Sequence, residues 1–85
     1  MDKILVEVIC PATSRHYDFW ISKRMQISQV IEKLIAEIQS FEKTEILFYS
    51  KEKVCLYSKK RQKAFSKNIS VIQAGISSGD ILMLI

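Results

Sequence analysis

A single change of hydrophobic periodicity, from two residues to 3.6, constrains the fold of this chain more than any other feature. Before residue 22, Tyr17, Phe19 and Ile21 alternate with His16, Asp18 and Trp20, as in a half-buried strand. From residue 27 onward, the apolar positions follow a helical period, and they are Ile27, Val30, Ile31, Leu34, Ile38 and Phe41. The pattern predicts one amphipathic helix, which we expect to begin near Gln26 without a strong capping residue and to fray around residues 40–43.

Two strands are predicted before this helix. Residues 4–10 are apolar and rich in β-branched side chains, and Pro11 with the small polar residues after it ends the run. Residues 16–21 form the second strand, so a short turn joins the two into a hairpin.

The part of the chain after the helix returns to strand patterns. Residues 46–49 and 54–57 are predicted strands, and the polar and basic residues 58–67 are predicted to form an exposed loop. Residues 69–76 then lead into a turn at residues 77–80 and a terminal strand at residues 81–85. The predicted order is ββαββ, a turn, and a last strand.

The fold class follows from burial. A helix with one apolar face and a sheet with one apolar face must cover each other, which predicts an α+β fold with a mixed sheet packed on one amphipathic helix. The order of elements is that of the β-grasp fold, in which the first and last strands lie parallel and adjacent. Because 85 residues support one modest core, we expect a single domain over residues 1–85.

Composition limits the class of protein further. The chain is 48% hydrophobic with two glycines and one proline, which favours a packed globule over a disordered segment. It contains neither an apolar run of membrane-spanning length nor a signal-peptide pattern, so we expect a cytoplasmic protein without direct membrane insertion. Cys10 and Cys55 are expected to be buried free thiols, and with one histidine and no ligand spacing we expect no metal and no cofactor.

The C-terminal segment carries a resemblance to known proteins. Residues 75–85, GISSGDILMLI, match the G-I-x-x-G-D-x-L-x-L ending of many ubiquitin-like proteins. The Tyr17-Asp18-Phe19 strand, the helix start at residues 27–31 and the position of the chain end resemble the YukD/EsaB family of small ubiquitin-like proteins.

This resemblance implies a ubiquitin-like fold and a cytoplasmic accessory role in the type VII secretion machinery of Gram-positive bacteria. The family supports or regulates export of small helical-hairpin substrates, and a membrane-bound secretion component is the partner it implies. The basic segment after residue 58 departs from the family, so the partner can differ from that of its relatives. Because the sequence ends at Leu84-Ile85 without a diglycine, we expect no conjugation to targets.

Strand alternation also predicts a binding face. If Val6, Val8, Ile46, Phe48, Leu82 and Leu84 point to the helix, an apolar set points outward, and it comprises Leu5, Ile9, Trp20, Leu47, Ile81 and Met83. An apolar set on an open sheet face is typical of a protein-recognition patch. Three alternatives remain: a register shifted by one residue, coverage of the patch by Lys3, Glu7 and Arg15, or a homodimer that buries it.

The basic residues suggest a second, different function. Lys59, Lys60, Arg61, Lys63 and Lys67 follow one another closely, with Lys51 and Lys53 upstream and with Tyr49, Tyr57 and Phe65 interleaved. Such a segment can steer a phosphate backbone or an acidic protein surface, or it can be a solvated loop. The alternative function is therefore a nucleic-acid-binding β-grasp domain using residues 51–67, against which stand a net charge of only +4 and the absence of RNA-binding signatures.

Enzymatic activity is not expected. The sequence has no glycine-rich phosphate loop and no nucleophile elbow, and His16 is the only histidine. Under the predicted alternation Cys10 faces the core and His16 faces solvent, so they do not form a catalytic pair. The sequence therefore predicts a non-catalytic interaction module.

Overall fold

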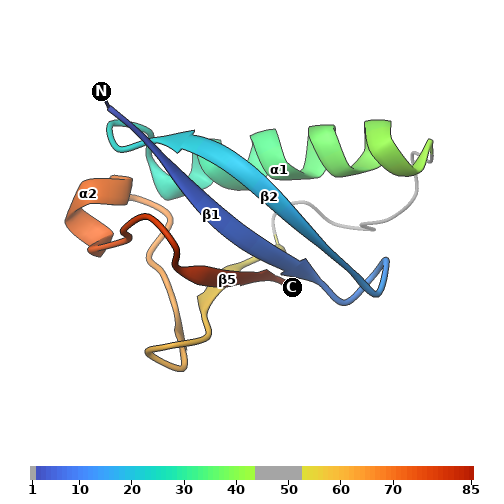
Figure 1. Ribbon diagram of the computed structural model, residues 1–85. Coiled ribbons are helices and arrows are strands. Elements are labelled where there is room, and N and C mark those ends of the chain that lie inside the picture. Colours follow the sequence, from blue (N-terminus) through green and yellow to red (C-terminus); the bar gives the residue numbers. More distant parts are fainter. Residues whose placement is uncertain (1, 44–52) are drawn as a thin grey trace.

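The computed structural model describes residues 2–43 and 53–85 and shows one mixed sheet with a long helix across one of its faces (Figure 1). The elements are β1 (Lys3–Cys10), β2 (Arg15–Ser22), α1 (Ile27–Glu42), β3 (Leu56–Ser58), β4 (Lys63–Ala64), α2 (Val71–Ala74) and β5 (Ile81–Leu84). The strand order is β2-β1-β5-β3-β4, with β1 and β5 parallel and the other neighbours antiparallel. The predicted α+β, β-grasp arrangement is confirmed, including the parallel pairing of the first and last strands.

The predicted hairpin of β1 and β2 is present. Its eight pairs run from Lys3 opposite Ser22 to Cys10 opposite Arg15. The turn closes with the Thr13 amide donating to the Cys10 carbonyl over 3.1 Å, and Ser14 adopts a left-handed backbone with φ of 57°. Both strands lie within one residue of their predicted bounds.

Helix α1 begins one residue after Gln26, as predicted, and it does have a capping contact. The Gln26 amide donates to Gln29 Oε1 over 2.9 Å, which satisfies a backbone donor at the helix start. Ile35 is buried although it was not in the predicted apolar set. The assignment of Phe41 to the core-facing side is wrong, because its side chain is 68% exposed and stacks on Tyr17 with ring centroids 6.2 Å apart.

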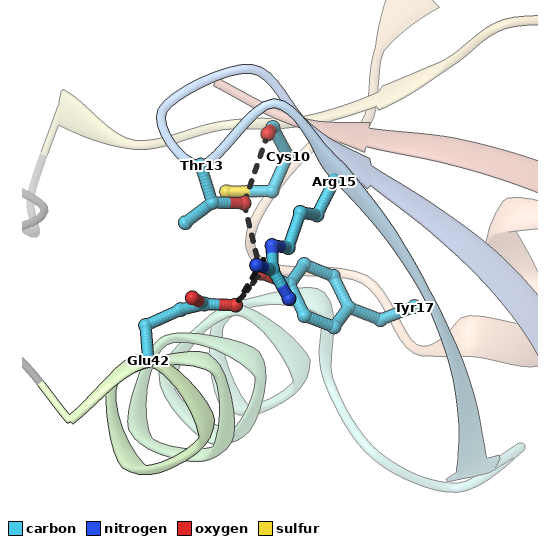
Figure 2. A network of polar contacts seen from close by, with 5 residues as sticks. All are labelled: Cys10, Thr13, Arg15, Tyr17 and Glu42. Carbon is cyan, nitrogen blue, oxygen red and sulfur yellow. Dashed lines mark hydrogen bonds and ion pairs between the residues drawn. The ribbon is translucent and has the colours of Figure 1, made fainter.

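The last turn of α1 is held rather than frayed (Figure 2). The Tyr17 hydroxyl lies 2.7 Å from Glu42 Oε2 and 2.8 Å from Thr13 Oγ1, and Arg15 Nε lies 3.7 Å from the same Glu42 oxygen. Burial, followed by the neighbouring Glu42 carboxylate, raises the pKa of Tyr17 above its ordinary value and outweighs the opposing effect of the Thr13 contact. These contacts tie the helix to the hairpin, so α1 extends to Glu42.

The core lies between α1 and the inner face of the sheet. Val6, Val8, Leu82 and Leu84 are buried there, as alternation predicts, whereas Ile46 and Phe48 lie outside the described residues. The remaining side chains of the core come mainly from α1, β2 and the segments around α2, and they include Phe19, Ile21, Leu34, Ile38, Leu56, Val71 and Ile76. Both cysteines are free thiols, and Cys10 is buried on this face as predicted. The prediction that Cys55 is buried is wrong, because this side chain is half-buried.

The segment between α1 and β5 differs most from prediction. The strand predicted at residues 46–49 lies outside the described residues, and the one predicted at residues 54–57 is β3 at Leu56–Ser58. The prediction of an exposed loop over residues 58–67 is wrong. This segment contains the edge strand β4, and two of its residues, Ser58 and Phe65, are buried.

A second helix, α2, was not predicted. The Gln73 amide donates to Ser70 Oγ over 3.1 Å and the Ser70 amide donates to Gln73 Oε1 over 2.9 Å, which forms a capping box. Gly75 ends the helix with φ of 75°. Among the described residues, neither helix combines the length and the apolar character that a membrane span requires.

Candidate protein-binding face

The outer face of the sheet, opposite α1, carries odd-numbered residues of β1 and even-numbered residues of β2. Leu5 lies directly opposite Trp20 in the hairpin register, and their side chains are 37% and 54% exposed. Large apolar side chains at these fractions stand out on a sheet face that normally carries polar groups. The predicted outward orientation of both residues is confirmed.

A second apolar group lies beside this pair on the same face. Met83 of β5 is opposite Ile9 of β1 on one side and Tyr57 of β3 on the other. Ile81 of β5 pairs with Glu7. Ile9, Ile81, Met83 and Tyr57 are all half-buried, so the central strands add apolar surface to this face. Leu47, the sixth predicted member of the patch, lies outside the described residues.

Polar groups lie between these apolar side chains but do not hide them. Glu7 and Asp18 are cross-strand neighbours in the middle of the face, and Glu7 Oε2 lies 2.7 Å from His16 Nδ1. Arg15, which was considered as a possible cover, turns to the inner face and pairs with Glu42 instead. The register is therefore not shifted by one residue, and the face combines apolar anchors with an acidic centre.

The predicted basic segment folds into the β3–β4 hairpin. Lys59, Lys60, Arg61 and Lys63 are exposed and Lys67 is half-buried. Arg61 does not project freely, because its guanidinium donates to the Ala74 carbonyl and, over 3.0 Å, to the Gly75 carbonyl. These carbonyls lie at the end of α2, where a cation is favoured. Arg61 therefore joins the hairpin to α2.

The aromatic side chains near these lysines are not displayed together. Phe65 is buried, Tyr57 lies on the outer face between Met83 and Ala64, and Tyr49 lies outside the described residues. A single-strand binding surface requires exposed rings in line with the basic groups. The described part of the hairpin lacks that arrangement.

The structure places Cys10 and His16 on opposite faces of the sheet. Cys10 is buried on the inner face, whereas His16, which pairs with Ile9 across the hairpin, is exposed on the outer face, as predicted. Within residues 2–43 and 53–85, no three His, Cys, Asp or Glu side chains are grouped closely enough to hold a metal ion.

Sequence reasoning missed a groove between β2 and α1. It has a volume of about 350 Å³, and its walls include Trp20 of the strand and Lys33, Glu37 and Phe41 of the helix. The exposed position of Phe41 at the end of the apolar helical stripe is the signal that points to it. The groove meets the apolar outer face at Trp20.

The sequence matches no protein-family model and no curated protein. Its fold does match solved structures along the whole chain. The ubiquitin-like domain of the type VII secretion protein EccD1 from Mycobacterium tuberculosis aligns with a TM-score of 0.73 at 15% identity, covering 100% of this chain and 99% of that one. The EccD5 ubiquitin-like domain from Mycobacterium xenopi aligns with a TM-score of 0.78 at 15% identity, covering 100% and 94%.

A larger assembly contains a similar domain. A chain of the ESX-5 inner membrane complex aligns with a TM-score of 0.79 at 11% identity, covering 100% of this chain and 21% of that one. At such identities these likenesses establish the fold alone, which is the ubiquitin-like β-grasp.

Proposed function

We propose that this chain is a non-catalytic, ubiquitin-like protein-interaction module of a type VII secretion system, and that it binds its partner through the outer sheet face. The observation that carries the proposal is the exposure of Trp20 and Leu5 beside Ile9, Ile81 and Met83 on adjacent strands. Tryptophan and methionine are well suited to anchor an interface because they bury large apolar areas and adapt to the opposing surface.

The secretion assignment is supported by two independent likenesses. The sequence resembles the YukD/EsaB family in its hairpin, helix start and C-terminal strand. The fold resembles ubiquitin-like domains of type VII secretion proteins, one of them within an inner membrane complex. The proposed partner is accordingly a membrane-bound secretion component, and the proposed site of action is the cytoplasm. The proposed role is to support or regulate export of small helical-hairpin substrates.

A protein partner fits the charges better than a nucleic acid. Glu7 and Asp18 lie within the apolar face and would repel a phosphate backbone. In the β3–β4 hairpin, Arg61 is engaged with α2 and Phe65 is buried, which leaves three exposed lysines, Lys59, Lys60 and Lys63, without a stacking platform.

The test is an export assay in the organism that encodes the protein. The gene is deleted, small helical-hairpin substrates are quantified in the medium and in the cells, and the strain is complemented with wild-type or variant genes. We expect export to be lost on deletion and restored by the wild-type gene. The Trp20→Ser gene should not restore it, because the variant lacks the large exposed apolar side chain that the partner would bury.

Matched variants separate loss of binding from loss of fold. Glu32→Ser alters an exposed side chain of α1, on the opposite side of the sheet from the face, and should restore export fully. Circular dichroism must show both variants folded to the same extent. Export that is unchanged in the deletion strain, with substrate present in the cells, would rule out the secretion role. Full restoration of export by Trp20→Ser would show that the outer face does not bind the partner.

A further inference from the structure

The outer edge of β2 has unused backbone hydrogen-bonding groups. In β1 the Glu7 amide donates to the Asp80 carbonyl over 3.0 Å, and the Leu5 carbonyl accepts from the Gly79 amide over 2.8 Å. The backbone groups of these odd-numbered residues therefore face β5, and the even-numbered residues of β1 face β2. The register places Phe19 opposite Val6, so the odd-numbered residues of β2 complete that ladder.

The even-numbered residues of β2 consequently direct their amides and carbonyls away from the sheet. One of these groups is already used, since Lys33 Nζ donates to the Trp20 carbonyl over 2.8 Å. The backbone groups of His16 and Asp18 have no protein partner within the described residues. Strand β2 ends the sheet, contains no proline and is eight residues long, so it is suited to accept another strand.

The groove described above runs along this edge. Trp20 and Phe41 are its exposed aromatic residues, at 54% and 68% exposure. Asp18 and Glu37 also line it, with the Asp18 side chain at its outer-face rim, and neither carboxylate has an ion-pair or hydrogen-bond partner within residues 2–43 and 53–85. The ammonium group of Lys33 is held by the Trp20 carbonyl. The groove therefore offers apolar surface together with two carboxylates and one ammonium group, which leaves it with a net negative charge.

We propose that the β2 edge and this groove bind an extended peptide segment that adds to the sheet as a further strand and carries basic residues among apolar ones. The backbone of the segment would pair with His16 and Asp18, and its side chains would alternate between the outer face beside Trp20 and the groove beside Phe41. Basic side chains on the outer side would reach the carboxylate of Asp18, and a basic side chain at the groove side would reach that of Glu37. This site shares Trp20 with the proposed protein-binding face, but it also uses the free backbone edge of β2 and the helix residues Glu37 and Phe41, so it does not depend on the secretion assignment.

Charge favours this occupant over a second copy of the chain. A second copy pairing through its own β2 would bring the same two unpaired carboxylates to a groove that is already negative. A basic segment neutralises them instead. Self-association through β2 is thus a distinct outcome that the test must detect.

The probe is a synthetic seven-residue peptide of alternating lysine and valine, blocked at both ends and titrated into the purified, ¹⁵N-labelled full chain. Two control peptides carry glutamate in place of lysine, or the same lysine sequence with every central amide N-methylated. We expect the lysine peptide to shift the amide signals of His16, Asp18 and Trp20 and to slow hydrogen exchange at the Asp18 amide at least tenfold. Both controls should bind at least about fivefold more weakly, because each loses a charge-assisted or backbone hydrogen bond.

Variants of the chain test each part of the proposal. Asp18→Asn should weaken binding about fivefold by removing one charge, and Asp18→Pro should weaken it about fivefold further by removing an amide that points to the free edge. Lys33→Ala should strengthen binding, because it frees the Trp20 carbonyl and removes a positive charge from the groove. If Lys33 only stabilised the fold, Lys33→Ala would instead weaken peptide binding.

Three results would overturn the proposal. Equal binding of the lysine and glutamate peptides would exclude the charge argument, and signal changes confined to residues away from β2 and α1 would exclude the site. A free protein that light scattering shows to be dimeric, with the Asp18 amide already protected, would assign the edge to a second copy. None of these results bears on the export assay, so the two proposals fail independently.

Discussion

Substitution of Gly75 by alanine should destabilise the fold more than the equivalent substitution of Gly79. Both glycines have left-handed backbones, with φ of 75° and 89°, so alanine at either position costs about 1–2 kcal/mol from backbone strain. A Cβ atom at Gly79 would meet nothing within 4 Å. At Gly75 it would lie 2.6 Å from Nη2 and 3.1 Å from Nη1 of Arg61, and the guanidinium would have to move.

The additional cost at Gly75 comes from the hydrogen bonds that Arg61 would lose. The guanidinium donates to the Ala74 and Gly75 carbonyls. Hydrogen bonds to charged groups contribute about 1.5–3 kcal/mol each when buried, and since Arg61 is exposed we expect about 1–2 kcal/mol for the two together. For a chain of this size the added cost corresponds to a melting temperature about 4–16 °C below that of Gly79→Ala.

The assay is thermal unfolding followed by circular dichroism for Gly75→Ala, Gly79→Ala and Arg61→Ala, and for the double variant of Gly75 and Arg61. In the Arg61→Ala background, Gly75→Ala should cost no more than Gly79→Ala, because no guanidinium remains to be displaced. The reasoning is refuted if Gly75→Ala lowers the melting temperature equally in both backgrounds.

Three further predictions concern the core, the hairpin contact and the basic hairpin. Leu34→Ala should cost about 3 kcal/mol in urea unfolding because the side chain is fully buried, and a loss below about 1 kcal/mol would contradict its place in the core. Tyr17→Phe should cost about 1 kcal/mol, since Glu42 keeps only the Arg15 contact. Because the pKa of Tyr17 is raised above the free value of 10.0, its contribution is complete below pH 10 and is lost as pH rises through the folded pKa. Melting temperatures above pH 10 should therefore fall less steeply for Tyr17→Phe than for the wild type, and parallel curves would refute this assignment. Lys60→Glu should change the free energy of unfolding by less than about 0.5 kcal/mol, and a loss as large as that of Arg61→Ala would contradict its solvent exposure.

The sequence pattern predicts the hairpin and the long helix because both are long enough for their periods to be read. Eight alternating residues in β1 and β2 determine which side chains face the core, and the same alternation places Leu5 and Trp20 on the outer face. The same reasoning cannot resolve α2, which is four residues long, or β4, which is two. These short elements are stabilised by the Ser70 capping box and by pairing with β3, which are tertiary and local contacts rather than a repeating pattern.

The features of the candidate sites were likewise only partly predictable from the sequence. The outward direction of Ile9, Ile81 and Met83 follows from strand periodicity alone. The role of Arg61 could not be predicted, because it depends on the hairpin approaching the end of α2, fourteen positions away in the sequence. The free edge of β2 likewise follows from the order of strands in the sheet, which periodicity does not specify.

The most direct test of the central claim, that the outer sheet face binds a membrane-bound secretion component, is photo-crosslinking in the organism that encodes the protein. A photo-reactive phenylalanine analogue is placed at Met83 on the face or at Lys60 on the basic hairpin, and the crosslinked products are identified by mass spectrometry. We predict that the probe at Met83 crosslinks to a subunit of the secretion membrane complex and that the probe at Lys60 does not. Crosslinks to that subunit from Lys60 but not from Met83, or from neither position, would contradict the account.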